Sequence, residues 1–226
     1  MSYPIVSLKW RPAYRVIPSR FPAVGLFERV ARPEDFDALY ALEALTNDRL
    51  RDEVGDISLM PPEERLFGPG STCIMAAFTH LNPQGSRFSD GSYGVFYCAR
   101  QRDTAIAETR YHAARFMAAT REPPMRLQMR LYSVNAQDRV ADLRAASKTE
   151  PRIVDPDDYA YTQAIGRGLR SEGALGLVYP SVRHRDGQCL AAFRTALVKN
   201  CLHAAYLEYQ WNGEGIDAVF EVTRVM

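Results

Sequence analysis

The sequence has almost no excess of charge of either sign. Its 226 residues contain 28 Lys and Arg against 27 Asp and Glu, which gives a formal net charge of +1. Proteins that bind nucleic acid through its phosphates carry a surplus of basic side chains, because neutralising phosphates releases counterions. We therefore expect no direct binding to nucleic acid, and any basic patch has to be local.

Cysteine is scarce, and the four that occur are widely spaced. Cys73, Cys98, Cys189 and Cys201 form no Cys-x-x-Cys pair, whereas zinc sites usually need closely spaced ligands. We expect no metal site. The four thiols are interpreted as small buried side chains of a protein in a reducing compartment.

Long hydrophobic runs are also missing. No stretch approaches the roughly 18 apolar residues that a membrane-spanning helix requires. The N-terminal MSYPIVSLKWRPAYRV has no apolar run ahead of a cleavage site, so no signal peptide is predicted. We expect no membrane association and a cytoplasmic location.

The composition, 46% hydrophobic and 24% charged, is that of an ordinary globular protein. A chain of 226 residues is also long enough to bury a hydrophobic core. Residues 3–30 are predicted to form short extended segments. A helix is predicted from Pro33, which is followed by acidic residues in its first turn and then an apolar stripe. A second helix is predicted over 71–81, with Ser71 as its cap. Residues 31–80 are therefore interpreted as a helical insertion.

A Gly-rich unit, GSRFSDGSYGVFYCA, covers residues 85–99. Its Asp90-Gly91 pair predicts a β-hairpin turn. Asp103 is the predicted N-cap of the helix that follows. The inner face of that helix is predicted to carry Ala105, Ile106, Thr109, Ala113, Phe116 and Met117.

The C-terminal half alternates between strand and helix patterns. Strands are predicted over 125–134, 174–181, 190–198, 204–211 and 216–225, with a turn at Asn212-Gly213, and a helix over 155–173. The prediction is a single α+β domain over residues 1–226, with a mixed sheet at its core and helices packed around it.

Polar side chains gather in the Gly-rich unit and the helix after it. Arg87 and Tyr97 lie on the two predicted arms of the hairpin, and Glu108 and His112 are four residues apart on one helix face. Taken singly, each has an ordinary interpretation. Arg87 would be a surface arginine, Tyr97 a core tyrosine, and Glu108 with His112 a surface ion pair. The glycines fit neither the dinucleotide-binding fingerprint nor the P-loop, so no Rossmann domain is predicted.

Three segments together resemble the RES-domain family: AYRVIPSRF, GSRFSDGSYGVFYCARQRDTAIAE and QAIGRGLRSEGALGLVYPSVRHRDGQCLAAF. The family is named for an Arg, a Glu and a Ser, which in this sequence are Arg87, Glu108 and Ser181. The resemblance is strongest over residues 85–195. Residues 31–80 depart from the shortest family members, and the chain after about 200 is poorly covered.

The resemblance implies a fold related to ADP-ribosyltransferases and the role of a toxin in a toxin–antitoxin pair. Such toxins split NAD⁺ between nicotinamide and ribose, in some members with inorganic phosphate as the acceptor. NAD⁺ is then a substrate, and no cofactor is expected. The implied partner is a small helix-turn-helix antitoxin of the Xre type. Self-association is a further expectation from the family.

The resemblance also assigns roles to single residues. Glu108 is expected to stabilise positive charge on the ribose. Arg87 is expected to bind the pyrophosphate, with Arg15 as a second candidate. The side chains that would complete the catalytic and substrate-binding set are Tyr97 at the nicotinamide, Ser181 at a ribose or phosphate oxygen, and Tyr93 and His112 as pocket lining.

Three other functions stay open at this level. The same bond cleavage can transfer ADP-ribose to a protein, and the sequence does not decide between phosphate, water and a protein side chain as acceptor. A non-catalytic NAD-binding module is the second alternative, against which the presence of all three name-giving residues argues. A nuclease toxin is the third, and the near-neutral charge gives it little support.

Overall fold

The computed structural model describes residues 3–18, 55–223 and 225. The helix predicted from Pro33, and with it most of the proposed 31–80 insertion, lies outside the described residues. The last part of that insertion forms two short 3₁₀ turns and one helix, α4 (Ser71–Thr79).

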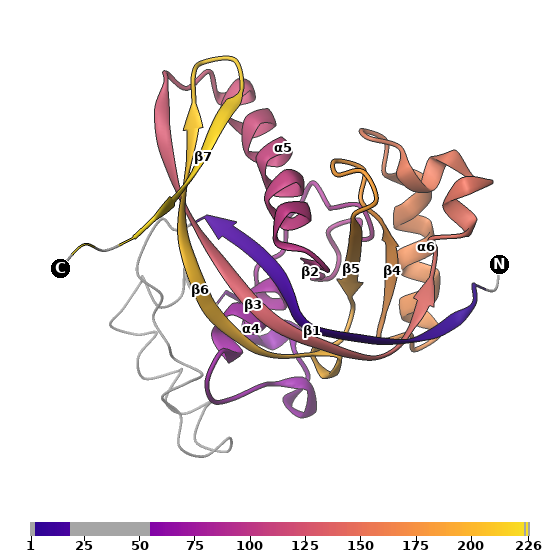
Figure 1. Ribbon diagram of the computed structural model, residues 1–226. Coiled ribbons are helices and arrows are strands. Elements are labelled where there is room, and N and C mark those ends of the chain that lie inside the picture. Colours follow the sequence, from indigo (N-terminus) through magenta and orange to yellow (C-terminus); the bar gives the residue numbers. More distant parts are fainter. Residues whose placement is uncertain (1–2, 19–54, 224, 226) are drawn as a thin grey trace.

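Seven strands form one mixed sheet. They are β1 (Ile5–Pro18), β2 (Phe96–Ala99), β3 (Met125–Asp142), β4 (Gly176–Pro180), β5 (Gln188–Ala192), β6 (Val198–Trp211) and β7 (Ile216–Val222). Their order is β1-β2-β5-β4-β3-β6-β7, and only β3 and β4 run parallel among these pairs. Because β1 also pairs with β3, five strands close into a ring of pairings, from which β6 and β7 extend (Figure 1).

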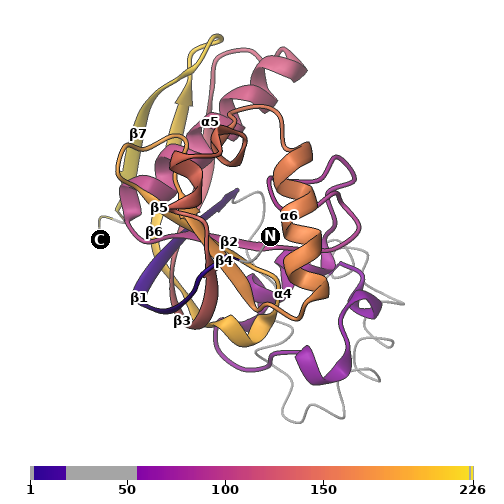
Figure 2. The same ribbon diagram turned by 90° about the vertical axis from the view of Figure 1, so that its right-hand side faces the viewer.

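Helices cover both faces of the sheet. On one face α4 packs onto a cluster that includes Trp10 and Phe96. On the other face α5 (Arg102–Thr120) and α6 (Ala160–Ser171) pack onto a cluster that includes Tyr179 and Trp211. Figure 2 shows α5 and α6 together, with α4 below them. The predicted α+β class with a mixed sheet is confirmed.

The N-terminal segment differs from the prediction. Instead of several short extended pieces, residues 5–18 form one long strand, whose register with β3 runs from Ile5 opposite Ala141 to Pro18 opposite Met129. A bulge interrupts this register between Trp10 and Ala13. The long antiparallel pairing with β3 keeps the Pro-containing segment in one extended strand, which local sequence alone does not indicate.

The hairpin predicted around Asp90-Gly91 is not formed. Residues 85–95 form an irregular loop. Its one β-type pairing is an isolated bridge between Ser86 and Ser89, and β2 begins only at Phe96. The Asp90 carboxylate accepts hydrogen bonds from the backbone and the hydroxyl of Ser92. Such local side-chain bonds compete with a strand ladder, and here they prevail.

Helix α5 forms where it was predicted, with differences at both ends. Its N-cap is Gln101, so Asp103 lies in the first turn instead of at the cap. Ala105 and Met117 are buried as expected, but Phe116 is 64% exposed. Helix α4 likewise has Gly70 as its N-cap, whereas Ser71 is its first residue.

All four cysteines are buried and none forms a disulfide, and the Cys201 thiol lies 2.9 Å from the sulfur of Cys73. The prediction that they serve as small buried side chains is confirmed.

Candidate active site

Glu108 and Ser181 meet where α5 passes the end of β4. The Ser181 hydroxyl donates a hydrogen bond of 2.6 Å to Glu108 Oε1, and the backbone N–H of Val182 donates to the same oxygen at 3.1 Å. The Cys189 thiol lies 3.8 Å from this oxygen, and burial together with the charge of Glu108 raises its pKa well above the usual value. The carboxylate is therefore held by two donors from the segment after β4.

The segment after β4 is tied down by its own hydrogen bonds. The Ser181 hydroxyl accepts from the backbone N–H groups of Arg183 (3.2 Å) and His184 (3.0 Å), and the Ser181 N–H donates to the carbonyl of Gly187. His184 Nδ1 lies 2.8 Å from the hydroxyl of Thr104 in the first turn of α5. The serine therefore reaches Glu108 from a pre-organised loop.

Two tyrosines fix the turn that carries Arg87. The Tyr97 hydroxyl accepts from the backbone N–H of Phe88 and bonds to the Ser86 hydroxyl, both at 2.9 Å. The Tyr93 hydroxyl donates to the carbonyl of Phe88 at 2.6 Å. Burial raises the pKa of both tyrosines to about 12, so both remain neutral donors and acceptors. The residue next to Arg87 is thus bound on both sides of its backbone.

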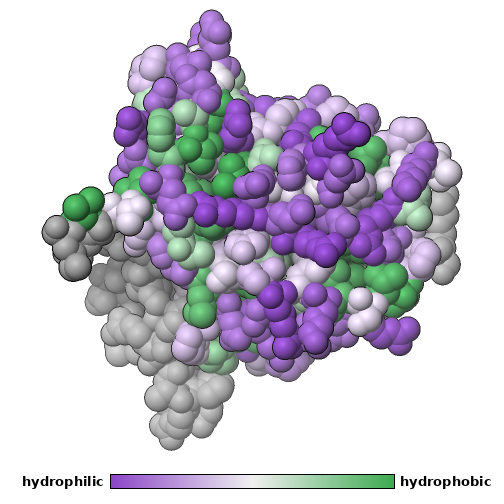
Figure 3. All heavy atoms as spheres, viewed as in Figure 1, coloured by the Kyte–Doolittle hydropathy of each residue, from purple (hydrophilic) through white to green (hydrophobic). Residues whose placement is uncertain are grey.

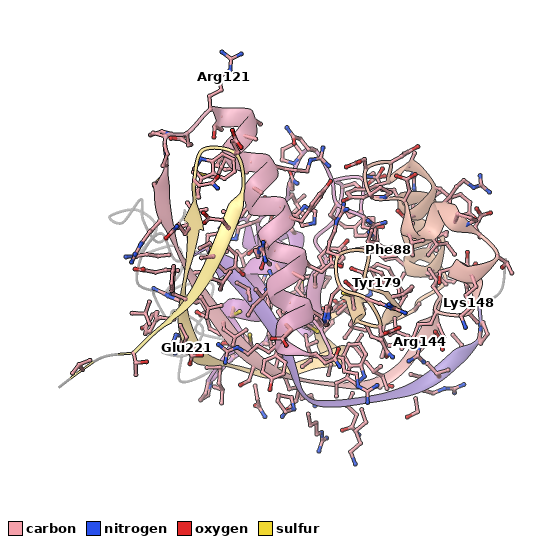
Figure 4. The ribbon with its side chains drawn as sticks, turned by 45° about the horizontal axis from the view of Figure 1, so that its top comes forward. Phe88, Arg121, Arg144, Lys148, Tyr179 and Glu221 are labelled. Carbon is pink, nitrogen blue, oxygen red and sulfur yellow. The ribbon has the colours of Figure 1, made fainter. Side chains whose placement is uncertain are left out.

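Phe88 anchors the same turn through its ring. It packs edge to face on Tyr179 of β4, with ring centroids 4.9 Å apart, and the two side chains lie together in Figure 4. Helix α6 approaches the turn so closely that a Cβ added at Gly166 would lie 2.2 Å from the carbonyl oxygen of Phe88. Only glycine permits this contact, so Gly166 has a packing role.

These contacts give the two tyrosines a positioning role that was not expected. Tyr97 was predicted to stack on nicotinamide and Tyr93 to line the pocket. In the structure, the hydroxyls are engaged inside the protein by Phe88. Both hydroxyls therefore position the Arg87 turn, and the expected contacts of the two tyrosines with a ligand stay predictions.

Arg87 itself is buried, with 8% of its surface exposed. Its Nη1 donates to the carbonyl of Ile153 at 3.3 Å, and its guanidinium lies 4.5 Å from the ring centroid of Tyr159. Among the described residues no carboxylate lies within ion-pair distance of it. A buried guanidinium without a carboxylate partner retains its positive charge for an anionic ligand.

His112 lies within electrostatic range of both Arg87 and Glu108. The imidazole has solvent-exposed surface, yet desolvation by the surrounding protein lowers its pKa; Glu108 raises that pKa, while Arg183 and Arg87 lower it further. All three charges therefore act on a single imidazole. The structure brings Arg87, Glu108, Ser181 and His112 into one region, as predicted.

Arg183 is a further residue of this region that the sequence reasoning did not single out. Its Nη2 donates to the carbonyl of Pro156 at 2.5 Å, and its guanidinium lies 3.3 Å from the ring centroid of Tyr111. The signal that could have identified it is its place two residues after Ser181, in YPSVR.

Arg15 does not join this group, which corrects the prediction. Its Nη1 donates to the carbonyl of Tyr97 at 2.8 Å, and its guanidinium lies 4.5 Å from the centroid of Phe96. Phe96 belongs to the cluster under α4, on the opposite face of the sheet from α5. The sheet therefore separates Arg15 from Glu108.

Over residues 3–18, 55–223 and 225, no group of three or more His, Cys, Asp or Glu side chains is placed to hold a metal ion. In the same ranges no helix has the length and apolar character needed to cross a membrane.

The fold and the site define a class of α+β protein in which an Arg before β2, a Glu on the following helix and a Ser at a strand end converge. The chain belongs to the RES domain family, whose model matches residues 62–212 and so includes Arg87, Glu108 and Ser181. An uncharacterized protein, y4oC, of Sinorhizobium fredii (strain NBRC 101917 / NGR234) is 31% identical over 211 residues, which cover 92% of this chain and 86% of that protein.

One solved structure also matches over most of the chain. It is the crystal structure of the M. tuberculosis MbcT–MbcA toxin–antitoxin complex, with 14% sequence identity and a TM-score of 0.47. The match covers 92% of this chain and 87% of the solved one.

Proposed function

We propose that this protein is the toxin of a toxin–antitoxin pair and that it degrades NAD⁺ by cleaving the bond between nicotinamide and ribose. Membership of the RES family supports the proposal. The observation that carries it is the hydrogen bond from Ser181 to Glu108, in a region where Arg87 and Glu108 act on the same histidine.

Glu108 supplies the charge that this reaction needs. When the bond breaks, its electron pair stays on the nicotinamide nitrogen, which becomes neutral, and positive charge develops on the ribose. A carboxylate held by Ser181 and Val182 stabilises that charge without having to reorganise. A phosphate or water oxygen then bonds to the ribose carbon, and an attacking water loses its proton to solvent.

Two guanidinium groups suit the pyrophosphate. Arg87 lies buried on the turn fixed by the tyrosines, and Arg183 lies two residues after Ser181 and, like Arg87, within electrostatic range of His112. Arginine binds phosphate through two parallel N–H donors, which fixes orientation as well as adding affinity. We assign Arg183 the second phosphate contact, in place of Arg15.

Phosphate and water are both compatible acceptors, so the protein is proposed as an NAD⁺ phosphorylase or glycohydrolase. Transfer of ADP-ribose to a protein is the second candidate, because it uses the same carboxylate. The proposed partner is a small helix-turn-helix antitoxin of the Xre type, which follows from the family. Self-association and a cytoplasmic location belong to the same proposal.

The test is nicotinamide release by purified Glu108→Gln compared with the unaltered protein, with and without phosphate. The glutamine oxygen still accepts from Ser181 and Val182, so the fold is kept while the charge is lost, and we expect turnover to fall by at least about a hundredfold. The matched control is Glu214→Gln, the same change on an exposed turn, which should retain full activity. Near-normal turnover by Glu108→Gln would refute the proposed role. A labelled protein without free ADP-ribose species would favour the second candidate.

A further inference from the structure

A second polar cavity lies away from the candidate active site. It has a volume of about 540 Å³ and lies among β1, β3 and the start of β6, with Ser7, Arg11, Gln137, Asp138, Arg139 and Lys199 in its lining. None of its lining residues belongs to the group around Glu108. The chemistry proposed around Glu108 therefore does not explain this cavity.

The pairing of the strands explains why these side chains share one surface. Ser7 lies opposite Arg139, and Asn135 lies opposite Lys199. The alternate residues Leu8 and Trp10 are buried in the cluster under α4, so their neighbours point away from that core. In Figure 3 hydrophilic residues gather over the lower middle of the molecule, where β1 crosses it in Figure 1.

The charge of the lining is positive and largely uncompensated. Arg11, Arg139 and Lys199 stand against Asp138 alone. The Arg11 guanidinium donates to the amide of Gln137, and neither Arg139 nor Lys199 has a carboxylate within ion-pair distance in the described parts of the chain.

Some basic side chains elsewhere in the molecule are paired. Arg126 pairs with Glu208, Arg144 with Asp142, and Arg194 with Glu64. In a chain with a net charge of +1, the cavity therefore places three cations beside a single carboxylate. Like charges placed together without a counter-charge repel one another, and an anion would relieve that repulsion.

We propose that this cavity binds a phosphate-bearing small molecule of nucleotide size. Its volume lies in the range of about 300–1,000 Å³ typical of small-ligand sites. Its polar lining offers an arginine fork, a lysine and side-chain amides, which suit phosphate oxygens better than an apolar ligand. Free inorganic diphosphate and the phosphates of a nucleotide share this chemistry, and the experiment separates them.

The experiment is isothermal titration calorimetry with the full chain carrying Arg87→Ala, which disables the proposed NAD⁺ site so that any remaining binding can be assigned. The ligands are inorganic diphosphate, ADP and adenosine. We expect ADP to bind and adenosine not to bind. Binding of diphosphate as tightly as ADP would assign the site to the phosphates alone. ADP binding at the cavity does not depend on whether Glu108→Gln is active. The cavity proposal and the proposed NAD⁺ cleavage can therefore be refuted independently of each other.

Two opposed variants make the outcome decisive. Arg139→Gln with Lys199→Gln removes two exposed cations without breaking an ion pair and should weaken ADP binding by at least about tenfold. Asp138→Asn removes the one lining carboxylate, keeps an oxygen for the N–H of Arg139, and should tighten binding.

The matched control is Arg121→Gln with Lys148→Gln, which removes the same charge from exposed positions on other elements (Figure 4). Loss of binding in this control equal to that of the cavity variant would show a general charge effect and overturn the proposal. Absence of ADP binding in the Arg87→Ala protein would overturn it as well. Tight binding of a short single-stranded oligonucleotide with no binding of ADP would assign the surface to nucleic acid instead.

Discussion

At the residue scale, the hydroxyl of Tyr97 links the core to the proposed phosphate site. It holds the Ser86 hydroxyl and the Phe88 N–H on either side of Arg87. Tyr97→Phe keeps the ring but leaves these groups without their partner, at a cost of about 1–3 kcal/mol of stability. We expect the KM for NAD⁺ to rise severalfold while kcat changes little, because Glu108 and Ser181 are untouched.

Steady-state kinetics on NAD⁺ check this prediction, with urea denaturation as the measure of stability. Tyr206→Phe is the control, since Tyr206 is 51% exposed and lies on β6, away from the turn. A fall in kcat with an unchanged KM would instead assign Tyr97 to the chemical step.

A second residue-scale effect concerns His112 and pH. Desolvation, with Arg183 and Arg87, lowers its pKa below the ordinary 6.5, although Glu108 opposes this shift. The unfolded chain therefore binds this proton at a higher pH than the folded protein does, so stability is lost as the pH falls below about 6.5. Thermal unfolding between pH 8 and pH 5.5 should show a smaller loss of stability for His112→Gln than for the unaltered protein. Equal losses in the two proteins would contradict the effect.

At the scale of elements, the segment from Ile153 to Tyr159 covers Arg87. The carboxylate of Asp157 accepts from the Tyr111 hydroxyl (2.6 Å) and from Arg115 (2.8 Å), which ties this segment to α5. Arg115 and Asp157 are both more than half exposed, so their ion pair contributes less than about 1 kcal/mol. The Tyr159 ring covers one face of the Arg87 guanidinium, so a ligand that binds this face has to displace Tyr159. Only the weak contacts of Asp157 with α5 oppose that displacement.

Asp157→Ala should loosen that segment without unfolding the protein. We expect amide hydrogen exchange over residues 153–159 to accelerate while exchange in α5 and β4 is unchanged. Hydrogen exchange followed by mass spectrometry measures this. The control is Asp217→Ala, an exposed aspartate at the start of β7. Unchanged exchange over 153–159 would show that Asp157 does not hold the segment.

Sequence reasoning succeeded where local patterns decide the structure. The alternation over 125–134 predicted a strand that is part of β3, and the Gly173 stop signal predicted the end of α6. It failed for the predicted hairpin, because Ser92 and Asp90 bond to each other instead of to a neighbouring strand. Turn residues alone did not reveal that competition.

At the scale of the whole molecule, the bulge in β1 explains why Arg15 was misplaced. Trp10 and Ala13 both point into the cluster under α4, so the alternation is shifted by one residue and Arg15 falls on that face as well. The convergence of Arg87, Glu108 and Ser181 has no local signature either, since Glu108 and Ser181 are 73 residues apart. Only the family resemblance predicted it.

The closure of the sheet by β1 has a consequence for how the protein is made. Ile5 is translated early, yet its partner Ala141 leaves the ribosome only after much of the chain, and Ser181 follows later still. A growing polypeptide therefore cannot assemble the pairing of Glu108 with Ser181 until residue 181 has been synthesised and has left the ribosome. Under the proposed function, each newly translated copy stays inactive until Ser181 has emerged, which leaves time for an inhibitor to be present before the site forms.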